Sequence, residues 1–335
     1  MTEQRTTSAR TVPFECRVAV LVPCYNEEQT IAKVVEDFRA QLPSAKIYVF
    51  DNNSTDQTVN AAQQAGAIVH REARRGKGYV LRTMFSQVEA DLYVMVDGDG
   101  TYPANKVHDL MTPILSGEAD MVIGSRLLPG SHSRFKVLNL TGNKLFLLFL
   151  NSIFRVHITD LLSGYRAIRR QLVKGLPLLS RGFESETELT VKCLERGYRI
   201  LEVPVALSPR PVGSRSKIRI VHDGFLILNT IFSLARDYKP LTSFGLLGLA
   251  LIMSGSIPGV IVIREFVITG QVHRLPSAVL AASLILSGLL VAFTGLALHS
   301  IARHFQELDC QIQRLFEAQD HSRAGDDTTS NRSAR

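Results

Sequence analysis

Two long stretches without a charged side chain constrain this chain more than any other feature. They cover residues 241–263 and 277–298, and both are rich in Leu, Ile, Gly and Ser. At a rise of about 1.5 Å per residue, a helix of either length crosses a hydrocarbon core of about 30 Å. Two buried core helices are the alternative, which the length and the absence of charge disfavour. We therefore predict a transmembrane hairpin over residues 241–300.

Basic residues around this hairpin indicate its orientation. Arg236, Lys239 and Arg303 flank its outer ends, whereas the connecting loop holds Arg264 and Arg274. The excess of basic residues at the outer ends is narrow, and it favours a cytoplasmic location for both termini. The polar N-terminus lacks the apolar core of a signal peptide, which points the same way. We predict a multi-pass protein of the inner (cytoplasmic) membrane whose N-terminal domain is cytoplasmic.

Strand and helix patterns alternate along the N-terminal half. The strand patterns cover residues 17–22, 46–50, 67–70, 92–96 and 121–124, and the helical patterns cover residues 27–41, 54–65, 78–89 and 103–115. Such alternation predicts an α/β domain with a mostly parallel sheet and helices on both faces. Parallel sheets bind ligands beyond the carboxyl ends of their strands, so the loops after the strands are where we expect the site.

The remaining segments complete the predicted domain plan. The α/β domain is expected over residues 17–217, between a disordered N-terminal tail over residues 1–16 and an amphipathic juxtamembrane helix over residues 218–238. That helix is basic at both ends, which is typical of a membrane-interface helix. Residues 145–150 form an apolar run too short to span a bilayer, either core or membrane surface. The polar residues 317–335 are expected to be disordered.

Charge and cysteine content narrow the classes of partner. The formal net charge of +7 suits anionic lipid or phosphorylated substrates. The sequence shows neither a basic helix interleaved with aromatic residues nor zinc-finger spacing, so nucleic acid is not an expected partner. The four cysteines have no metal-ligand spacing and are expected to be reduced thiols. A homo-oligomer is compatible with this composition.

Polar motifs follow three of the predicted strands. Asp97-Gly98-Asp99 closes an apolar strand, and two carboxylates so placed can hold a divalent cation against a diphosphate, with Mg²⁺ or Mn²⁺ as the suited ions. An ordinary turn is the alternative. Asp51 and Asn52 begin a polar turn suited to base and ribose recognition or to helix capping. Lys77 lies between two glycines, which suits either a diphosphate or a solvated charge run.

Five motifs occur in an order that resembles a known family. They are Pro23-Cys24-Tyr25-Asn26-Glu27, residues 51–56, Gly76-Lys77-Gly78, Asp97-Gly98-Asp99 and Gly124-Ser125-Arg126. The chain resembles family 2 glycosyltransferases of the GT-A fold over roughly residues 16–300. It looks most like the polyprenyl-phosphate glycosyltransferases, which include dolichol-phosphate mannose synthases and bacterial relatives with a C-terminal membrane hairpin. The resemblance implies a GT-A catalytic domain, an amphipathic interface helix and two transmembrane helices.

The resemblance assigns donor-side roles to individual residues. It implies a nucleotide pocket of Pro23, Tyr25 and Glu27, with Asp51 and Asn52 on the base or ribose. Asn52 replaces an Asp that is frequent in the family, which leaves the identity of the base open. It further implies that the metal and the diphosphate are held by Asp97, Gly98, Asp99 and Lys77, with Asp99 the favoured direct metal ligand. Thr101 stands where the family often has Gln.

The resemblance also assigns acceptor-side roles. Arg126 corresponds to the Arg of the Gly-Ser-Arg motif, which implies binding of the acceptor phosphate, and Arg134 is expected to assist. Arg215 and Lys217 are expected to clamp phosphates, with lipid headgroups as the alternative partner. Asp160 is the candidate catalytic acid or base, or a residue that orients the acceptor. Catalysis is thus expected from Asp97, Asp99, Arg126 and Asp160.

The expected reaction is an inverting sugar transfer from a nucleotide-sugar to a polyprenyl phosphate, undecaprenyl or dolichyl, at the cytoplasmic membrane face. A UDP-hexose is favoured as donor over GDP-mannose, and the product would serve cell-envelope glycan or glycoconjugate synthesis. A processive polysaccharide synthase is an alternative, although the chain has no Trp for the Gln-x-x-Arg-Trp motif of such enzymes. A catalytically silent membrane scaffold is the other, which the retention of Asp97 and Asp99 disfavours.

Overall fold

The computed structural model describes residues 16–129, 131, 147–148, 150–152, 156–182, 184–209 and 220–333. The chain divides into two compact units, Met1–Asn143 with Ile158–Asp223, and Lys144–His157 with Gly224–Arg335. The sheet lies in the first unit and the long apolar helices in the second. The domain expected over residues 17–217 therefore contains a short segment, Lys144–His157, that groups with the apolar helices.

A seven-stranded sheet with the order β3-β2-β1-β4-β6-β5-β7 forms the centre of the first unit. Neighbouring strands pair in parallel except for β6, which runs antiparallel between β4 and β5. The mostly parallel sheet predicted from the sequence is confirmed. Its strands are β1 (Val18–Cys24), β2 (Lys46–Asp51), β3 (Ile68–Arg71), β4 (Leu92–Met95), β5 (Met121–Ser125), β6 (Arg166–Arg169) and β7 (Ile200–Pro204).

Helices cover both faces of this sheet because its strands are apolar on both sides. In β1, Val20 and Val22 join one core cluster, whereas Ala19 and Leu21 join the other. Helices α1 and α4 pack into the first cluster, and α3, α6 and α7 into the second. The helices are α1 (Ile31–Gln41), α2 (Thr58–Gln64), α3 (Lys77–Gln87), the 3₁₀ turn η1 (Ala104–Lys106), α4 (Val107–Leu115), α6 (Arg170–Gly175) and α7 (Ser185–Glu195).

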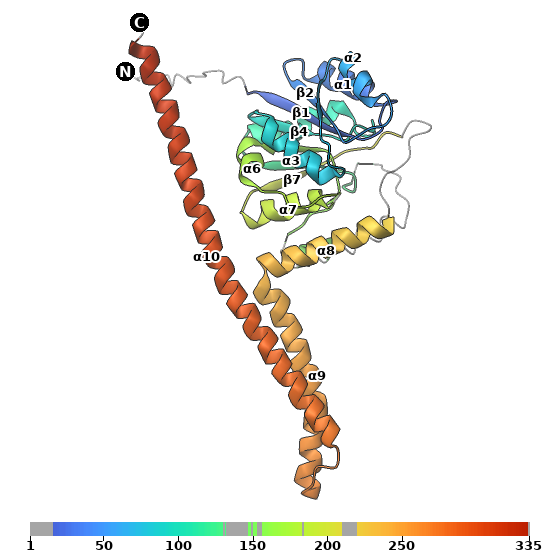
Figure 1. Cartoon of the computed structure of the whole chain (residues 1–335), viewed down its shortest axis with the longest axis vertical. Coiled ribbons are helices and arrows are strands. Elements are labelled where there is room, and N and C mark those ends of the chain that lie inside the picture. Colours follow the sequence, from blue (N-terminus) through green and yellow to red (C-terminus); the bar gives the residue numbers. More distant parts are fainter. Residues whose placement is uncertain are drawn as a thin grey trace, which may run out of the picture. The chain divides into compact units, whose positions relative to one another are not determined.

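The second unit contains α8 (Ile220–Tyr238), α9 (Pro240–Thr269) and α10 (Leu275–Ser333). Two of its segments, Pro240–Thr269 and Leu275–Phe305, are long and apolar enough to cross a membrane. Figure 1 shows α10 running beside α9 as a hairpin. Gly270, with a φ of 70°, ends α9 in the left-handed conformation that glycine adopts most easily.

Small residues bring the two hairpin helices into close backbone contact. A methyl group added at Gly288 would lie 2.7 Å from the carbonyl oxygen of Gly248, and one at Gly248 would lie 2.7 Å from that of Gly288. Similarly, a methyl group at Gly255 would lie 2.9 Å from the Ala281 carbonyl oxygen. Such close approach gives the van der Waals contact that holds helices together in lipid. The two helices of the hairpin are therefore packed backbone to backbone along these small residues.

The structure differs from expectation at the C-terminus. We expected residues 317–335 to be disordered, whereas α10 continues to Ser333. Ala, Gln, Glu and Arg are common in the first part of this segment, and their high helix propensity is the physical reason for the difference. The apolar run at residues 145–150 contributes the buried Leu147 and Leu150 to the second unit. The expected N-terminal tail, residues 1–16, lies outside the described residues up to residue 15.

Candidate active site

The polar loops after β1, β2 and β4 lie at one edge of the sheet. These strands are adjacent and parallel, with Cys24 of β1 opposite Asp51 of β2 and Leu21 of β1 opposite Met95 of β4. Their carboxyl ends therefore open on the same side, and the three motifs that follow them come together. This is the edge at which the sequence predicted the site.

The first two loops are fastened to each other by hydrogen bonds. The backbone N–H of Asn26 donates to Ser54 Oγ at 2.9 Å, and the N–H of Thr55 donates to Asn26 Oδ1 at 2.8 Å. The N–H of Glu27 donates to Thr58 Oγ1 at 2.8 Å. Asn26 has a φ of 52°, a left-handed conformation that Asn tolerates better than most residues. These contacts fix the loop that carries Pro23, Tyr25 and Glu27 in the sequence-based assignment.

Asn52 uses its side-chain amide to hold the segment that leads to Lys77. Its oxygen accepts the backbone N–H of Gly76 at 2.7 Å, and its nitrogen donates to the carbonyl oxygens of Arg74 at 2.7 Å and Glu72 at 3.3 Å. A carboxylate could not make the two donated bonds. The structure thus gives Asn52 a structural partner in residues 72–76, which sequence reasoning missed.

Asp51 is buried at the carboxyl end of β2, directly before Asn52. Its Oδ1 accepts the backbone N–H of Ser54 at 3.1 Å, and its Oδ2 lies 3.9 Å from Nε of the exposed Arg71. The neighbouring Arg75 guanidinium lies 5.8 Å from the centre of the Tyr25 ring, within the range of a cation–π contact. Tyr25, Asp51 and Arg75 therefore gather at the carboxyl ends of β1 and β2, the place expected for a nucleotide.

Lys77 connects two carboxylates that are distant in the sequence. Its Nζ lies 2.5 Å from Asp97 Oδ1 and 2.6 Å from Glu186 Oε1, and its side chain is only 10% exposed. Burial alone would lower the pKa of Lys77, but the two carboxylates raise it well above its ordinary value. Burial raises the pKa of Glu186 in turn. The alternating Glu184, Glu186 and Glu188 are a sequence pattern typical of either a polar strand face or a helix start, and the structure places Glu186 in the first turn of α7.

The carboxylates of the Asp-Gly-Asp motif are held in different ways. Asp99 is nearly buried, and its Oδ1 accepts hydrogen bonds from Thr101 N at 3.1 Å and Thr101 Oγ1 at 2.6 Å. Asp97 packs against the backbone of Gly164, where a Cβ atom would lie 2.3 Å from Asp97 Oδ2. A Cβ atom at Gly98 would likewise collide with Cys24 Sγ at 2.5 Å. Two glycines thus make room for Asp97 and for its strand end.

Asp97 and Asp99 fit a divalent metal whose remaining coordination positions are filled by phosphate oxygens and water. Among the residues that the structure describes, no three His, Cys, Asp or Glu side chains form a closed metal cluster. Mg²⁺ and Mn²⁺ bound with nucleotides use one or two carboxylates together with phosphate oxygens and water, so a pair suffices. Asp97 already receives a cation, the Lys77 ammonium group, at 2.5 Å. The oxygen ligands at this strand end are therefore of the kind that Mg²⁺ or Mn²⁺ takes.

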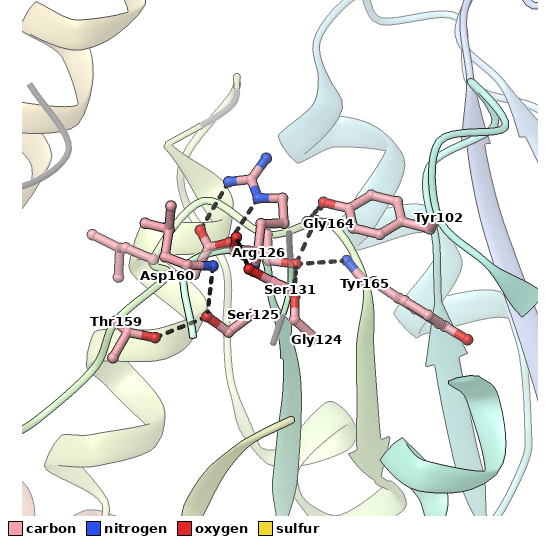
Figure 2. Close-up of polar contacts among 12 residues, drawn as sticks. Tyr102, Gly124, Ser125, Arg126, Ser131, Thr159, Asp160, Gly164 and Tyr165 are labelled. Carbon is pink, nitrogen blue, oxygen red and sulfur yellow. Dashed lines mark hydrogen bonds and ion pairs between the residues drawn. The ribbon is translucent and has the colours of Figure 1, made fainter. Parts of the chain in front are cut away.

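Arg126 and Asp160 form an ion pair that Figure 2 shows with its neighbours. Arg126 donates to Asp160 Oδ2 from Nε at 2.7 Å and from its backbone N–H at 2.9 Å, and to Oδ1 from Nη2 at 2.8 Å. Asp160 is fully buried, while the Arg126 side chain is 17% exposed. Burial alone would lower the pKa of Arg126, but Tyr102 and Asp160 raise it above its ordinary value. The guanidinium therefore stays charged.

A second carboxylate holds the backbone of the Asp160 loop. Glu202 of β7 accepts the backbone N–H groups of Thr159 and Asp160, each at 2.9 Å. Ser125 Oγ and Thr159 Oγ1 lie 2.8 Å apart, which joins this loop to the end of β5. Glu202 thus holds the backbone of residues 159 and 160, and Arg126 holds the side chain of Asp160. Sequence reasoning did not find Glu202, because the contact depends on β5 and β7 being neighbours.

Tyr102 and Arg166 complete the support of this loop. The Tyr102 hydroxyl accepts the backbone N–H of Gly164 at 3.0 Å, and burial raises the Tyr102 pKa to about 12. Arg166 is fully buried and donates to the carbonyl oxygens of Leu161 and Ser163 at 2.8 and 2.9 Å. Arg166 therefore holds the backbone of the loop that follows Asp160. The predicted phosphate-binding residues Arg134, Arg215 and Lys217 lie outside the described residues.

A mostly parallel sheet with a carboxylate pair after β4 and helices on both faces is the arrangement of a GT-A transferase domain, and comparison with known proteins agrees. The model of the family described as "Glycosyl transferase family 2" matches residues 19–176. Glycosyltransferase AglJ of Haloferax volcanii is 33% identical over 301 residues, which cover 89% of this chain and 98% of that protein. The chain belongs to glycosyl transferase family 2 and is a glycosyltransferase.

Other similar proteins extend this finding. The polyprenol monophosphomannose synthase of Mycolicibacterium smegmatis is 27% identical, over 59% of this chain and 79% of its own. The undecaprenyl-phosphate mannosyltransferase of Micrococcus luteus is also 27% identical, over 59% of this chain and 86% of its own. Glucosyl-3-phosphoglycerate synthase from Mycobacterium tuberculosis, solved with Mn²⁺, UDP-glucose and phosphoglyceric acid, superposes with a TM-score of 0.55 at 24% identity. It covers 66% of this chain and 80% of its own, and the predicted GT-A fold is confirmed.

Proposed function

We propose that this enzyme transfers a hexose from a nucleotide-sugar to a polyprenyl phosphate, with inversion at the anomeric carbon. The proposal depends above all on one observation, the Arg126–Asp160 ion pair in a chain with two membrane-length helices. A cation for an acceptor phosphate and carboxylates for a donor diphosphate are the two halves that such a reaction needs. Relatives named for polyprenol and undecaprenyl phosphate support a lipid acceptor.

The donor half of the proposal uses the loops after β1, β2 and β4. Tyr25 and Asp51 are proposed to contact the base and ribose, with Pro23 and Glu27 forming the rest of the pocket. Asp97 and Asp99 would hold Mg²⁺ or Mn²⁺, which supplies positive charge to the leaving diphosphate when bound. A UDP-hexose is the favoured donor, supported by the solved relative that holds UDP-glucose, and GDP-mannose is the alternative, supported by the relatives named for mannose.

The acceptor half assigns the phosphate to Arg126. A guanidinium that donates two hydrogen bonds to one buried carboxylate, which also accepts the backbone N–H of Arg126, is preorganised, so little conformational freedom is lost when the phosphate arrives. Both oxygens of Asp160 accept hydrogen bonds from Arg126, which favours an orienting role for Asp160 over the role of a base. A phosphate monoester is largely ionised at neutral pH and needs no strong base to attack.

The bond changes balance without a further reactant. An oxygen of the acceptor phosphate forms a bond to the anomeric carbon on the face opposite the leaving group. The bond from that carbon to the diphosphate breaks, and the nucleoside diphosphate leaves with the electron pair. Arg126 holds the attacking phosphate against repulsion from the donor, and the alignment of the two reactants is itself a large part of the expected acceleration.

The second unit is proposed to hold the enzyme at the cytoplasmic face of the inner membrane. Phe225, Leu228 and Phe232 are exposed and recur at helical spacing along α8, which suits a helix lying in a membrane interface. Leu246, Ile257 and other large apolar residues of α9 and α10 are more than half exposed, as expected for side chains that meet lipid. The basic residues outside the hairpin favour cytoplasmic termini.

Transfer of label from a nucleotide-sugar to lipid tests the proposal. Purified full-length protein in detergent is given radiolabelled UDP-glucose, other UDP-hexoses or GDP-mannose with undecaprenyl phosphate and Mn²⁺ or Mg²⁺. Label from one donor should enter the organic phase, and EDTA or Asp99→Ala should abolish the transfer. Label that enters the organic phase equally well with EDTA would contradict metal use. Folded protein that transfers no label from any of these donors to undecaprenyl or dolichyl phosphate would contradict the proposed reaction.

A further inference from the structure

The position of Lys77 raises a question about how a metal reaches Asp97. Lys77 Nζ lies between Asp97 Oδ1 and Glu186 Oε1, at 2.5 and 2.6 Å. These side chains come from the start of α3, the end of β4 and the first turn of α7. Of the three, Asp97 is the most accessible at 30% exposure, whereas Glu186 is 4% exposed. The ammonium group therefore neutralises Asp97, the more exposed of its two carboxylate partners, while it remains paired with the buried Glu186.

Two cations cannot share this carboxylate without cost. An ammonium ion and a divalent ion within about 4 Å of each other repel strongly in a partly buried site. Any metal held by Asp97 must therefore either displace Lys77 or accept a weaker contact. Gly164 lies close to the whole Asp97 carboxylate, because a Cβ atom at Gly164 would lie 2.3 Å from Oδ2 and 2.8 Å from Oδ1. The contact between Lys77 and Asp97 thus competes directly with metal binding.

We propose that Lys77 guards the metal site, occupying Asp97 until the metal and the donor diphosphate arrive, and that Glu186 is the positioning residue that receives it. This inference depends on the proposed function, because it assumes a divalent metal at Asp97 and a diphosphate beside it. With Glu186 as a second partner, Lys77 loses one carboxylate on metal binding but is never left buried and unpaired. The ammonium group stays within reach of the leaving diphosphate.

The rigidity of α7 makes Glu186 a fixed anchor. Thr190 Oγ1 donates to the Glu186 carbonyl oxygen at 2.9 Å and also accepts from the buried Arg166 at 2.8 Å. The helix is buried along this turn and packs into one of the two cores. The backbone of Glu186 is therefore held by the packing of α7, and its carboxylate stays available as the second partner of Lys77.

Binding of Mn²⁺ alone, followed by electron paramagnetic resonance on the full-length protein in detergent, tests the proposal. Lys77→Met removes the competing cation and should lower the Mn²⁺ dissociation constant at least about tenfold, as expected when the competent state rises from a tenth to nearly all molecules. The double variant Lys77→Met/Glu186→Gln leaves no buried unpaired charge and should tighten binding equally. Glu186→Gln alone leaves Lys77 with Asp97 as its carboxylate partner and should weaken binding at least about threefold.

Glu188→Gln is the matched control. Glu188 lies on the same helix, pairs with the buried Lys192 at 2.6 Å and accepts the backbone N–H groups of Leu179 and Ser180. It should lower thermal stability and leave the Mn²⁺ affinity of the folded protein unchanged. Equal Mn²⁺ affinity in all variants, or weaker binding in Lys77→Met, would overturn the guard role while leaving the proposed transfer intact. A wild-type protein that binds no Mn²⁺ would overturn both the guard role and the proposed metal.

Discussion

Replacing Asp160 by Asn separates an orienting role from a catalytic base. Asp160 receives three hydrogen bonds from Arg126 with its two carboxylate oxygens. Asn keeps one acceptor oxygen and turns an NH₂ group towards a donor, so at least one charge-assisted bond of about 1.5–3 kcal/mol is lost. If that loss falls on the placement of Arg126 in the transition state, at 1.36 kcal/mol per tenfold change in rate, kcat/KM decreases about 10- to 150-fold.

The assay is initial-rate transfer at varied polyprenyl phosphate, with the donor saturating, across pH 5.5–8.5. An orienting role predicts that Asp160→Asn raises the KM for the acceptor more than the KM for the donor and keeps the shape of the pH profile. Thermal unfolding of the same preparation shows how much of the loss of activity comes from unfolded protein. A loss of more than about 1,000-fold in kcat, with an unchanged acceptor KM and a vanished acid limb, would refute the reasoning and make Asp160 a base.

Three further predictions follow from the structure. Asn52→Asp loses both hydrogen bonds to the carbonyl oxygens of Glu72 and Arg74, so it should destabilise the first unit by about 1–3 kcal/mol in urea unfolding. A change no larger than that of Asn105→Asp, at an exposed position, would contradict the role of Asn52. Gly288→Leu should lower the melting temperature in detergent, because overpacking against Gly248 and Ile252 costs about 1–3 kcal/mol. Gly245→Leu is the control and should leave the melting temperature unchanged, since nothing lies within 4 Å of its Cβ position. Equal melting temperatures of the two variants would count against the helix contact. The hydrogen bond from Arg74 lowers the pKa of Glu72 from 4.5 to about 2, so its stabilisation is complete above pH 4.5 and is lost as the pH falls towards 2. Because Arg74 is mostly exposed, wild type should lose only about 1 kcal/mol more than Glu72→Gln over this range in urea unfolding, and parallel curves would exclude the contribution.

Local patterns were sufficient to predict the fold class and the edge of the sheet that carries the site. Apolar runs of strand length, separated by helical patterns, made β1 to β5 recognisable, and the polar loops after them marked the carboxyl ends. The hairpin followed from the absence of charge in two long stretches. In contrast, the antiparallel insertion of β6 between β4 and β5 depends on pairing across the sheet and has no local signal in the sequence.

The supporting residues of the site were out of reach for the same reason. Glu186 meets Lys77 across 109 residues of sequence, and Glu202 meets Asp160 across 42. An acidic residue in a helix start or a strand does not indicate its partner, because tertiary packing alone chooses it. Asn52 shows the opposite case, since its place in a familiar motif suggested a ligand contact, whereas its amide holds backbone at residues 72–76.

The two halves of the site hold their charges in physically different ways, and this difference suits their different tasks. On the proposed acceptor side one carboxylate accepts two hydrogen bonds from the guanidinium and one from the backbone of Arg126, and Glu202 accepts the backbone N–H of Asp160, so the cation is held in place. On the donor side one ammonium group lies between two carboxylates, so it can leave one and keep the other. An acceptor phosphate that must be aligned benefits from the rigid arrangement, because misalignment of the attacking oxygen costs rate directly. A donor that binds together with a metal ion needs the adjustable arrangement on the proposed donor side. Before binding, the ammonium group of Lys77 neutralises the carboxylates, and on binding Asp97 must become available to the metal.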